Sequence, residues 1–197
     1  MGLIHRDIKP SNIMVCRRGG MDDVAKLLDF GLVRAPDSAA DAANGRREAV
    51  IMGTPHYMPP EQSTGMENVD ERGDVYSLGC VAYFMLSGHP PYEELGSLSL
   101  VQSLLSAEPV PIERYRPEVP ADLRQVVARC MKRQISQRFF TVEMLAQALD
   151  ECECAREWDS RQATAWWDRV RKDAERVPPT RHASNLETCS TAIPAAV

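Results

Sequence analysis

The sequence predicts a mainly α-helical domain with a few short β strands near its N-terminus. Residues 74–88 are apolar on nearly every side, which is typical of a buried helix. Residues 120–131 and 141–152 carry their apolar side chains on one stripe, as amphipathic helices do. The strands are expected in the apolar runs 2–5, 12–15 and 24–30, the first two of which flank a polar loop.

Local residues place the ends of these helices. Asp74 can cap the first helix or complement the charge at its start, and Gly88 followed by His-Pro-Pro stops it. Pro120 stands at the start of the second helix, and Thr141 is a suitable N-cap for the third. The three prolines of "GTPHYMPPEQ", residues 53–62, predict a segment without regular structure. One face of the third helix is expected to consist of Val142, Leu145 and Leu149.

Composition and charge are those of an ordinary globular protein. The 197 residues are 44% hydrophobic and 26% charged, and the net charge of −5 with no long basic run argues against binding to nucleic acid. No apolar run approaches the roughly 20 residues of a membrane-spanning helix, and we expect no secretory signal. The six cysteines match no zinc pattern, so we expect reduced thiols in a cytoplasmic protein.

The chain is expected to form one domain with a C-terminal extension. The domain is predicted over residues 1–152, and a helical extension over 153–177. Residues 178–197 resemble a disordered tail in composition, and 34–50 a mobile surface loop.

Four motifs occur in a fixed order: H-R-D-I-K-P-S-N at 5–12, D-F-G at 29–31, G-T-P at 53–55 and P-P-E at 59–61. Together they resemble the C-terminal lobe of a eukaryotic-type serine/threonine protein kinase of the bacterial subgroup. The resemblance implies a protein kinase-like fold, mainly α, with short strands around the catalytic loop. It also implies transfer of the γ-phosphoryl group of Mg-ATP to Ser or Thr of a protein substrate.

The resemblance assigns the catalytic roles to three residues. Phosphoryl transfer depends on positioning and electrostatics more than on covalent chemistry. By resemblance, Asp7 orients the substrate hydroxyl and accepts its proton, and Lys9 places a cation on the γ-phosphate. Thr54 resembles the residue that bridges these two near the acceptor hydroxyl.

Nucleotide and metal binding are assigned in the same way. Asn12 and Asp29 offer the hard oxygen atoms that suit Mg²⁺, and the resemblance makes them the metal ligands. Met14 matches the residue beneath the adenine of ATP, and Lys9 also contacts the nucleotide.

Other matching positions have supporting roles by resemblance. Asp74 is expected to hydrogen-bond the backbone of the His-Arg-Asp turn, and Glu61 to form a mostly buried ion pair with Arg138. The remaining structural positions are His5, Arg6, Phe30 and Gly31.

Regulation is expected in the segment between the second and third motifs. Kinases with an Arg before the catalytic Asp, as Arg6 is here, commonly need an anion on the activation loop, yet residues 39–53 contain no Ser or Thr. We expect Glu48 to substitute for a phosphate. The alternative is that Glu48 is solvated beside Arg46 and Arg47, and that Ser38 or an outside factor carries the switch.

Only four residues precede His5, and the sequence has no glycine-rich phosphate loop or strand lysine of the kinase N-terminal lobe. We therefore expect the reading frame to continue upstream and the isolated chain to be inactive or nearly so. The alternative function is a non-catalytic, kinase-like module that binds proteins. An aminoglycoside-type phosphotransferase is a weaker third reading, because the segment 53–61 serves peptide substrates.

Overall fold

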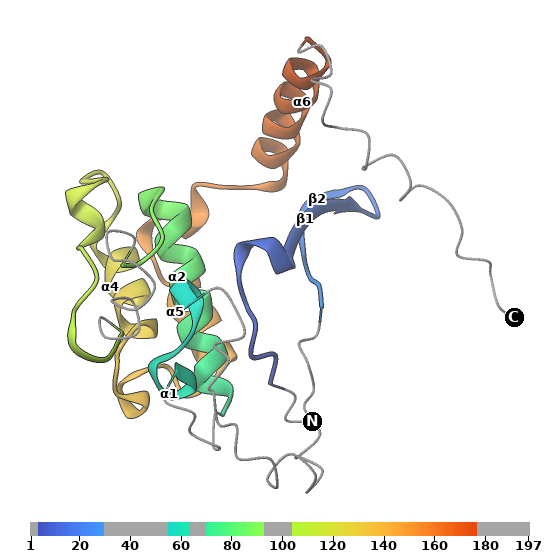
Figure 1. The fold of residues 1–197 in the computed structure, drawn as a ribbon. Helices are drawn as coiled ribbons and strands as arrows, with labels where there is room; N and C mark the ends of the chain where they lie inside the picture. The colour runs from blue at the N-terminus through green and yellow to red at the C-terminus, as the bar shows by residue number, and fades with distance from the viewer. Residues whose placement is uncertain (1–3, 30–54, 64–69, 93–103, 177–197) are drawn as a thin grey trace, which may run out of the picture. The chain divides into compact units, whose positions relative to one another are not determined.

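The computed structural model describes residues 4–29, 55–63, 70–92 and 104–176 (Figure 1). Its contacts divide the chain into two units, residues 1–158 and 159–197. The predicted mobile loop 34–50 and the predicted tail 178–197 lie outside the described residues.

The described part of the first unit begins with a loop, which is followed by a β hairpin. Strand β1 (Ile13–Arg18) pairs antiparallel with β2 (Met21–Leu27), and Ile13 stands opposite Leu27. The connecting glycines, 19 and 20, have φ angles of 58° and 83°, the conformation that a tight hairpin turn requires. The strand predicted at 2–5 is wrong over its described residues, because the N–H of His5 bonds a side chain instead of a neighbouring strand.

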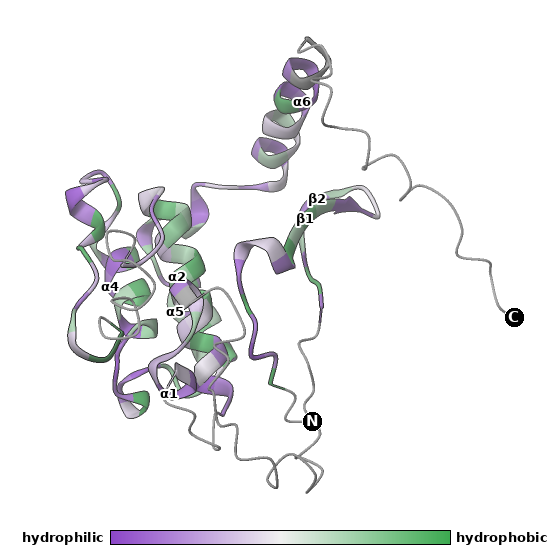
Figure 2. Ribbon diagram, in the orientation of Figure 1, coloured by the Kyte–Doolittle hydropathy of each residue, from purple (hydrophilic) through white to green (hydrophobic). Residues whose placement is uncertain are grey.

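Helix α2 (Glu71–Ser87) is the central element of the helical part of this unit. It begins three residues before the expected start, because Asp70 and not Asp74 is the N-cap and accepts from the N–H of Arg72 at 3.0 Å. It ends at Gly88, as predicted, in a left-handed conformation with φ 79°. Figure 2 shows hydrophobic residues along much of α2. Met85 is an exception to the predicted burial, since it is 76% exposed.

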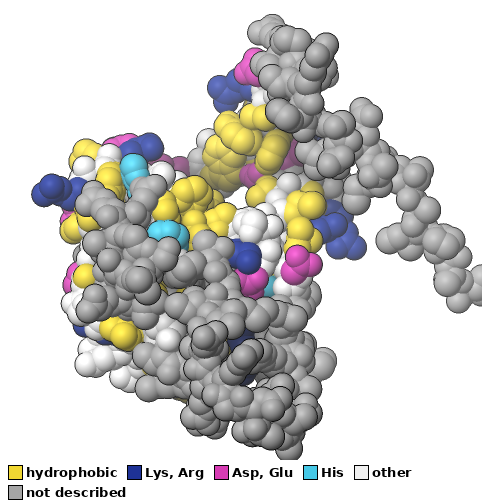
Figure 3. Space-filling model, viewed as in Figure 1, with side chains coloured by type: hydrophobic (Ala, Val, Ile, Leu, Met, Phe, Trp, Pro, Cys, Tyr) yellow, Lys and Arg dark blue, Asp and Glu magenta, His cyan; other side chains and the backbone are white. Residues whose placement is uncertain are grey.

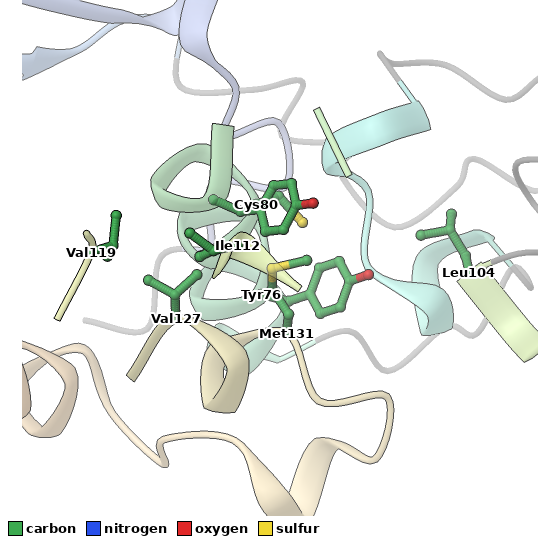
Figure 4. Packing of buried hydrophobic residues seen from close by; sticks show 8 residues of the cluster. Tyr76, Cys80, Leu104, Ile112, Val119, Val127 and Met131 are labelled. Atoms are coloured by element: carbon green, nitrogen blue, oxygen red, sulfur yellow. The ribbon is translucent and has the colours of Figure 1, made fainter. Parts of the chain in front are cut away.

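The two amphipathic helices that the sequence predicts are both present. Helix α4 (Ala121–Cys130) contacts α2 directly, and α5 (Val142–Asp150) follows it. The main core, drawn in Figure 4, includes residues of α2 and α4 and consists of Tyr76, Cys80, Tyr83, Leu104, Ile112, Val119, Val127 and Met131. A second cluster consists of Val75, Cys130, Phe139 and Leu145.

The expected apolar face of α5 is only partly buried. Thr141 caps the helix as predicted, accepting from the N–H of Met144 at 3.2 Å. Leu145 is buried, but Val142 and Leu149 remain 46% and 38% exposed. The apolar stripe in the sequence therefore predicts which side of α5 faces the core, but not how many residues of that side are buried.

The proline-rich segment is more regular than predicted. It forms a 3₁₀ turn at Pro55–Tyr57 and the short helix α1 at Pro60–Ser63. Both elements start with proline, and the first position of a helix tolerates proline because its N–H has no intrahelical partner there. Further 3₁₀ turns lie at Pro10–Asn12, Ile112–Arg114, Ile135–Gln137 and Glu153–Arg156.

The second unit contains helix α6 (Ser160–Arg176), where the sequence predicts a helical extension. Asp159 begins it, because its carboxylate accepts from the N–H groups of Arg161 and Gln162, both at 2.9 Å. Hydrophobic side chains gather on one part of α6 (Figure 3), and Trp166 packs edge-on against Trp167 with ring centres 4.7 Å apart. No helix in the described part of the chain is both long and apolar enough to cross a membrane.

Candidate active site

The turn at residues 5–7 is fixed by one carboxylate from α2. Asp74 accepts hydrogen bonds from the backbone N–H of His5 at 2.7 Å and from that of Arg6 at 2.9 Å. Its position one turn inside α2 is what directs the side chain at this loop, 68 or 69 residues away in sequence. The structure thus contains the contact that the resemblance implied for Asp74.

The ring of His5 connects the turn to the end of the hairpin. His5 is 6% exposed, and its Nε2 lies 3.2 Å from the carbonyl oxygen of Leu28, while its Nδ1 accepts from the N–H of Asp7 at 3.3 Å. This pattern assigns the proton to Nε2, because Nδ1 has to act as the acceptor. His5 therefore positions the loop, in agreement with the supporting role expected for it.

Asp7, Lys9 and Asn12 form a polar cluster beside this turn. The Asp7 Oδ2 atom lies 2.8 Å from the Lys9 Nζ and accepts from the Asn12 Nδ2 at 3.0 Å. Asn12 also donates to the Asp7 carbonyl at 2.8 Å. The Asp7 side chain remains 37% exposed. A carboxylate held between a cation and an amide, yet open to solvent, is suited to orienting a hydroxyl group and accepting its proton.

The hairpin brings Asn12 and Asp29 into the same region. The Asn12 carbonyl accepts from the N–H of Leu28 at 2.8 Å, and Asp29 is the next residue along the chain. Asp29 has φ 49°, in the left-handed region that non-glycine residues seldom adopt. Both hydrogen bonds of the Asn12 side chain use Nδ2, so its Oδ1 is the atom left for a cation.

The described residues contain no group of three His, Cys, Asp or Glu side chains arranged to hold a metal. One amide oxygen and one carboxylate nevertheless fit Mg²⁺, which takes few protein ligands and keeps water and phosphate oxygens. Met14, on the neighbouring strand β1, is 49% exposed, and so can contact a ligand.

A buried ion pair anchors α1 to the helical part of the unit. Arg138 Nη1 and Nη2 donate to Glu61 Oε1 and Oε2 at 2.7 and 2.8 Å, although the residues are 77 positions apart. Glu61 and Arg138 are 5% and 3% exposed. The expected contact is therefore present.

The Protein kinase domain family matches residues 1–149 of this chain. The chain belongs to the protein kinase family. The predicted kinase-like fold is thereby confirmed, and the kinase motifs account for the polar cluster and for the ion pair.

Bacterial serine/threonine-protein kinases are among its similar relatives. PknB of Mycolicibacterium smegmatis and Pkn1 of Myxococcus xanthus are each 38% identical over 75% of this chain, which covers 23% and 21% of their lengths. The probable serine/threonine-protein kinase CE0033 of Corynebacterium efficiens is 33% identical over 99% of the chain, which covers 29% of its length. The chain spans less than a third of the length of each of these relatives.

The described part of the kinase site brings together most of the predicted residues. Asp7, Lys9 and Asn12 are in direct contact, and His5, Arg6 and Asp74 hold their loop. The predicted positions that lie outside the described residues are Phe30, Gly31, Ser38, Glu48 and Thr54.

One contact in the kinase site was not predicted. The Gln62 Nε2 donates to the backbone carbonyl of Arg6 at 3.2 Å. The only signal in the sequence is that Gln62 follows Glu61, and that adjacency does not reveal which way the amide points.

Proposed function

We propose that the protein containing this chain transfers the γ-phosphoryl group of ATP to Ser or Thr hydroxyls of protein substrates. The contact of Asp7 with both Lys9 and Asn12, beside Asp29, is the observation that carries the proposal. Protein kinases use ATP and Mg²⁺, and this cluster contains the charges that such chemistry needs.

Each member of the cluster has a role in the proposed reaction. Asp7 orients the substrate hydroxyl and accepts its proton, and Lys9 stabilises negative charge that develops on the transferred group. Asn12 Oδ1 and the Asp29 carboxylate would hold Mg²⁺, which when bound supplies positive charge to the phosphate oxygens. Met14 would contact the adenine, and Thr54 would bridge Asp7 and Lys9 near the acceptor.

Regulation is part of the proposal. Glu48 substitutes for a phosphate on the activation segment and pairs with Arg6, so the enzyme needs no phosphorylation at Ser38. A cytoplasmic location fits a kinase that draws on the ATP pool.

A direct assay tests the catalytic proposal. The full-length protein encoded by the gene is assayed for phosphate transfer from ATP to a Ser/Thr-containing protein, together with Asp7→Asn. The variant should lose at least about 100-fold in kcat, because removing a positioned general base has effects of this size. Asp150→Asn, at an exposed position of α5, is the matched control and should keep activity.

The same proteins separate the enzyme from the alternative binding module. Activity that disappears in Asp7→Asn supports the enzyme. An inactive wild type whose capture of partner proteins is unchanged by Asp7→Asn contradicts it and supports the module.

A further inference from the structure

The peptide unit that joins Arg6 to Asp7 is held at both of its polar ends. Its N–H, contributed by Asp7, donates to the Nδ1 of His5 at 3.3 Å. Its C=O, contributed by Arg6, accepts from the Nε2 of Gln62 at 3.2 Å. A peptide unit is planar, so two such contacts fix its orientation, and with it the direction in which the Asp7 side chain leaves the backbone.

This backbone has a particular need for such support. Arg6 has φ 64°, a left-handed conformation that costs free energy for a non-glycine residue and persists only where the surroundings enforce it. The Asp74 carboxylate accepts from the N–H groups of His5 and Arg6, which precede the peptide between Arg6 and Asp7. Gln62 instead contacts the carbonyl group of Arg6, to which Asp74 makes no hydrogen bond.

Packing alone does not explain a glutamine at position 62. Its Oε1 is buried without a hydrogen-bond partner among the described residues, which is unfavourable for a polar atom. Rotating the amide by half a turn would place Oε1 against the Arg6 carbonyl, so that two acceptors would face each other. The donor Nε2 therefore has to face Arg6, and this hydrogen bond is what the amide provides.

The short helix that carries Gln62 is also held in place. It follows Glu61 in α1, and Glu61 is fixed by two hydrogen bonds from the buried Arg138. A displacement of α1 therefore moves the group that holds the Arg6–Asp7 peptide.

We propose that Gln62 is a positioning residue, which directs the Asp7 carboxylate by holding the peptide between Arg6 and Asp7. Through this hydrogen bond, the position of α1 affects the orientation of the Asp7 carboxylate. This inference rests on the proposed kinase function.

The test compares three variants of the full-length protein. Gln62→Met keeps the length of the side chain but removes the donor, and should lower kcat about tenfold with little change in the KM for ATP or substrate. Gln125→Met, on the exposed side of α4, is the matched control and should keep the wild-type kcat. Melting temperatures of all variants are measured to show that they fold.

The third variant, Gln62→Glu, gives a readout that a packing role would not affect. An ionised carboxylate repels the Arg6 carbonyl, whereas a protonated one donates a hydrogen bond to it. The activity of Gln62→Glu relative to wild type should therefore rise as the pH falls from 8 to about 5.5, whereas that of Gln62→Met stays constant. The nearby charge of Glu61 is already paired with Arg138 and is common to all variants.

The outcomes separate this inference from the proposed function. Gln62→Met with a kcat within about twofold of an active wild type, and a flat ratio for Gln62→Glu, overturn the inference alone. A wild type without activity that depends on Asp7 overturns the proposed function. In that case, amide hydrogen exchange of residues 5–8 is decisive: faster exchange in Gln62→Met but not in Gln125→Met supports the contact, and equal exchange rejects it.

Discussion

Arg138 uses every donor of its guanidinium group. Nε donates to the Lys132 carbonyl, and Nη1 and Nη2 share four further hydrogen bonds among both oxygens of Glu61 and the carbonyls of Arg72 and Arg133. An arginine has five N–H donors in a fixed planar arrangement, so this set of partners fits Arg and not Lys. One side chain thereby joins α1, the start of α2 and the segment before α5.

Removing this side chain is expected to be strongly destabilising. Arg138→Ala should lower the free energy of unfolding by roughly 3–5 kcal/mol, because Glu61 would stay buried without its partner. The double variant Glu61→Leu/Arg138→Met leaves no buried charge and should lose less, although three carbonyls lose their donor. Urea unfolding monitored by circular dichroism measures both; equal losses, or a single variant as stable as wild type, would contradict the argument.

Two buried thiols should make the free energy of unfolding depend on pH in the alkaline range. Burial raises the pKa of Cys130 from 9.0 to about 12, and burial also raises the pKa of the fully buried Cys80. Above pH 9 the unfolded chain loses these protons while the folded chain keeps them, so the free energy of unfolding falls as the pH rises from 9 towards 12. The expected slope is about 1.4 kcal/mol per pH unit and thiol.

Chemical denaturation between pH 8 and 11 measures this slope. Cys80→Ala removes one of the two thiols and should give a shallower dependence than wild type, whatever its stability at pH 8. Identical slopes for the two proteins would mean that Cys80 titrates similarly in the folded and unfolded states.

At the level of elements, α2 and α4 approach unusually closely at Gly79. A Cβ atom added there would lie 2.5 Å from the Cβ of Cys130 and 3.0 Å from the Cγ of Met131, and atoms of this kind do not come so close. The absence of a side chain at position 79 therefore sets the separation of the two helices.

Gly79→Ala should push these helices apart. Although alanine favours helices more than glycine does, overpacking should dominate and lower the free energy of unfolding by roughly 1–3 kcal/mol. A double-mutant cycle with Cys130→Gly, which removes the opposing Cβ, isolates the clash. The double variant should be more stable than the sum of the single effects predicts; strict additivity would show that the atoms do not collide.

The sequence predicts most of these elements because they follow local rules. The stripe on 120–131, the cap at Thr141 and the stop at Gly88 depend on neighbouring residues, and the structure has all three. The errors arise where a distant group competes. Asp74 would cap a helix on local grounds, but its carboxylate binds the loop at His5, and Asp70 caps α2 instead.

In the candidate site, too, local patterns predict some features, whereas contacts between distant residues could not be predicted. The motifs contain Asp7, Asn12 and Glu61, and the family resemblance assigns the roles of these residues and of Arg138. The contact of Gln62 with Arg6 depends on the left-handed backbone at Arg6 and on the placement of α1, neither of which a local pattern encodes.

At the scale of the whole molecule, the contacts group residues 153–158 with the first unit, while the domain end at residue 152 stays a prediction. The sequence predicts the end at residue 152, whereas the contacts divide after Trp158. Two hydrogen bonds hold the intervening residues: the Trp158 Nε1 donates to the Asp23 Oδ2 at 2.8 Å, and the N–H of Glu153 donates to the Asp122 Oδ2 at 2.7 Å. The residues after 152 therefore return to β2 and to the start of α4.

Truncation distinguishes the two boundaries. A chain ending at residue 158 keeps both hydrogen bonds and should melt within about 2 °C of the full chain, whereas a chain ending at 152 loses them. The shorter chain should therefore melt several degrees lower. Trp158→Phe in the longer truncation is the matched control: it keeps an aromatic ring but not the donor to Asp23, and should lower the melting temperature by roughly half as much. Calorimetry measures all three, and equal melting temperatures for the two truncations would place the boundary at 152.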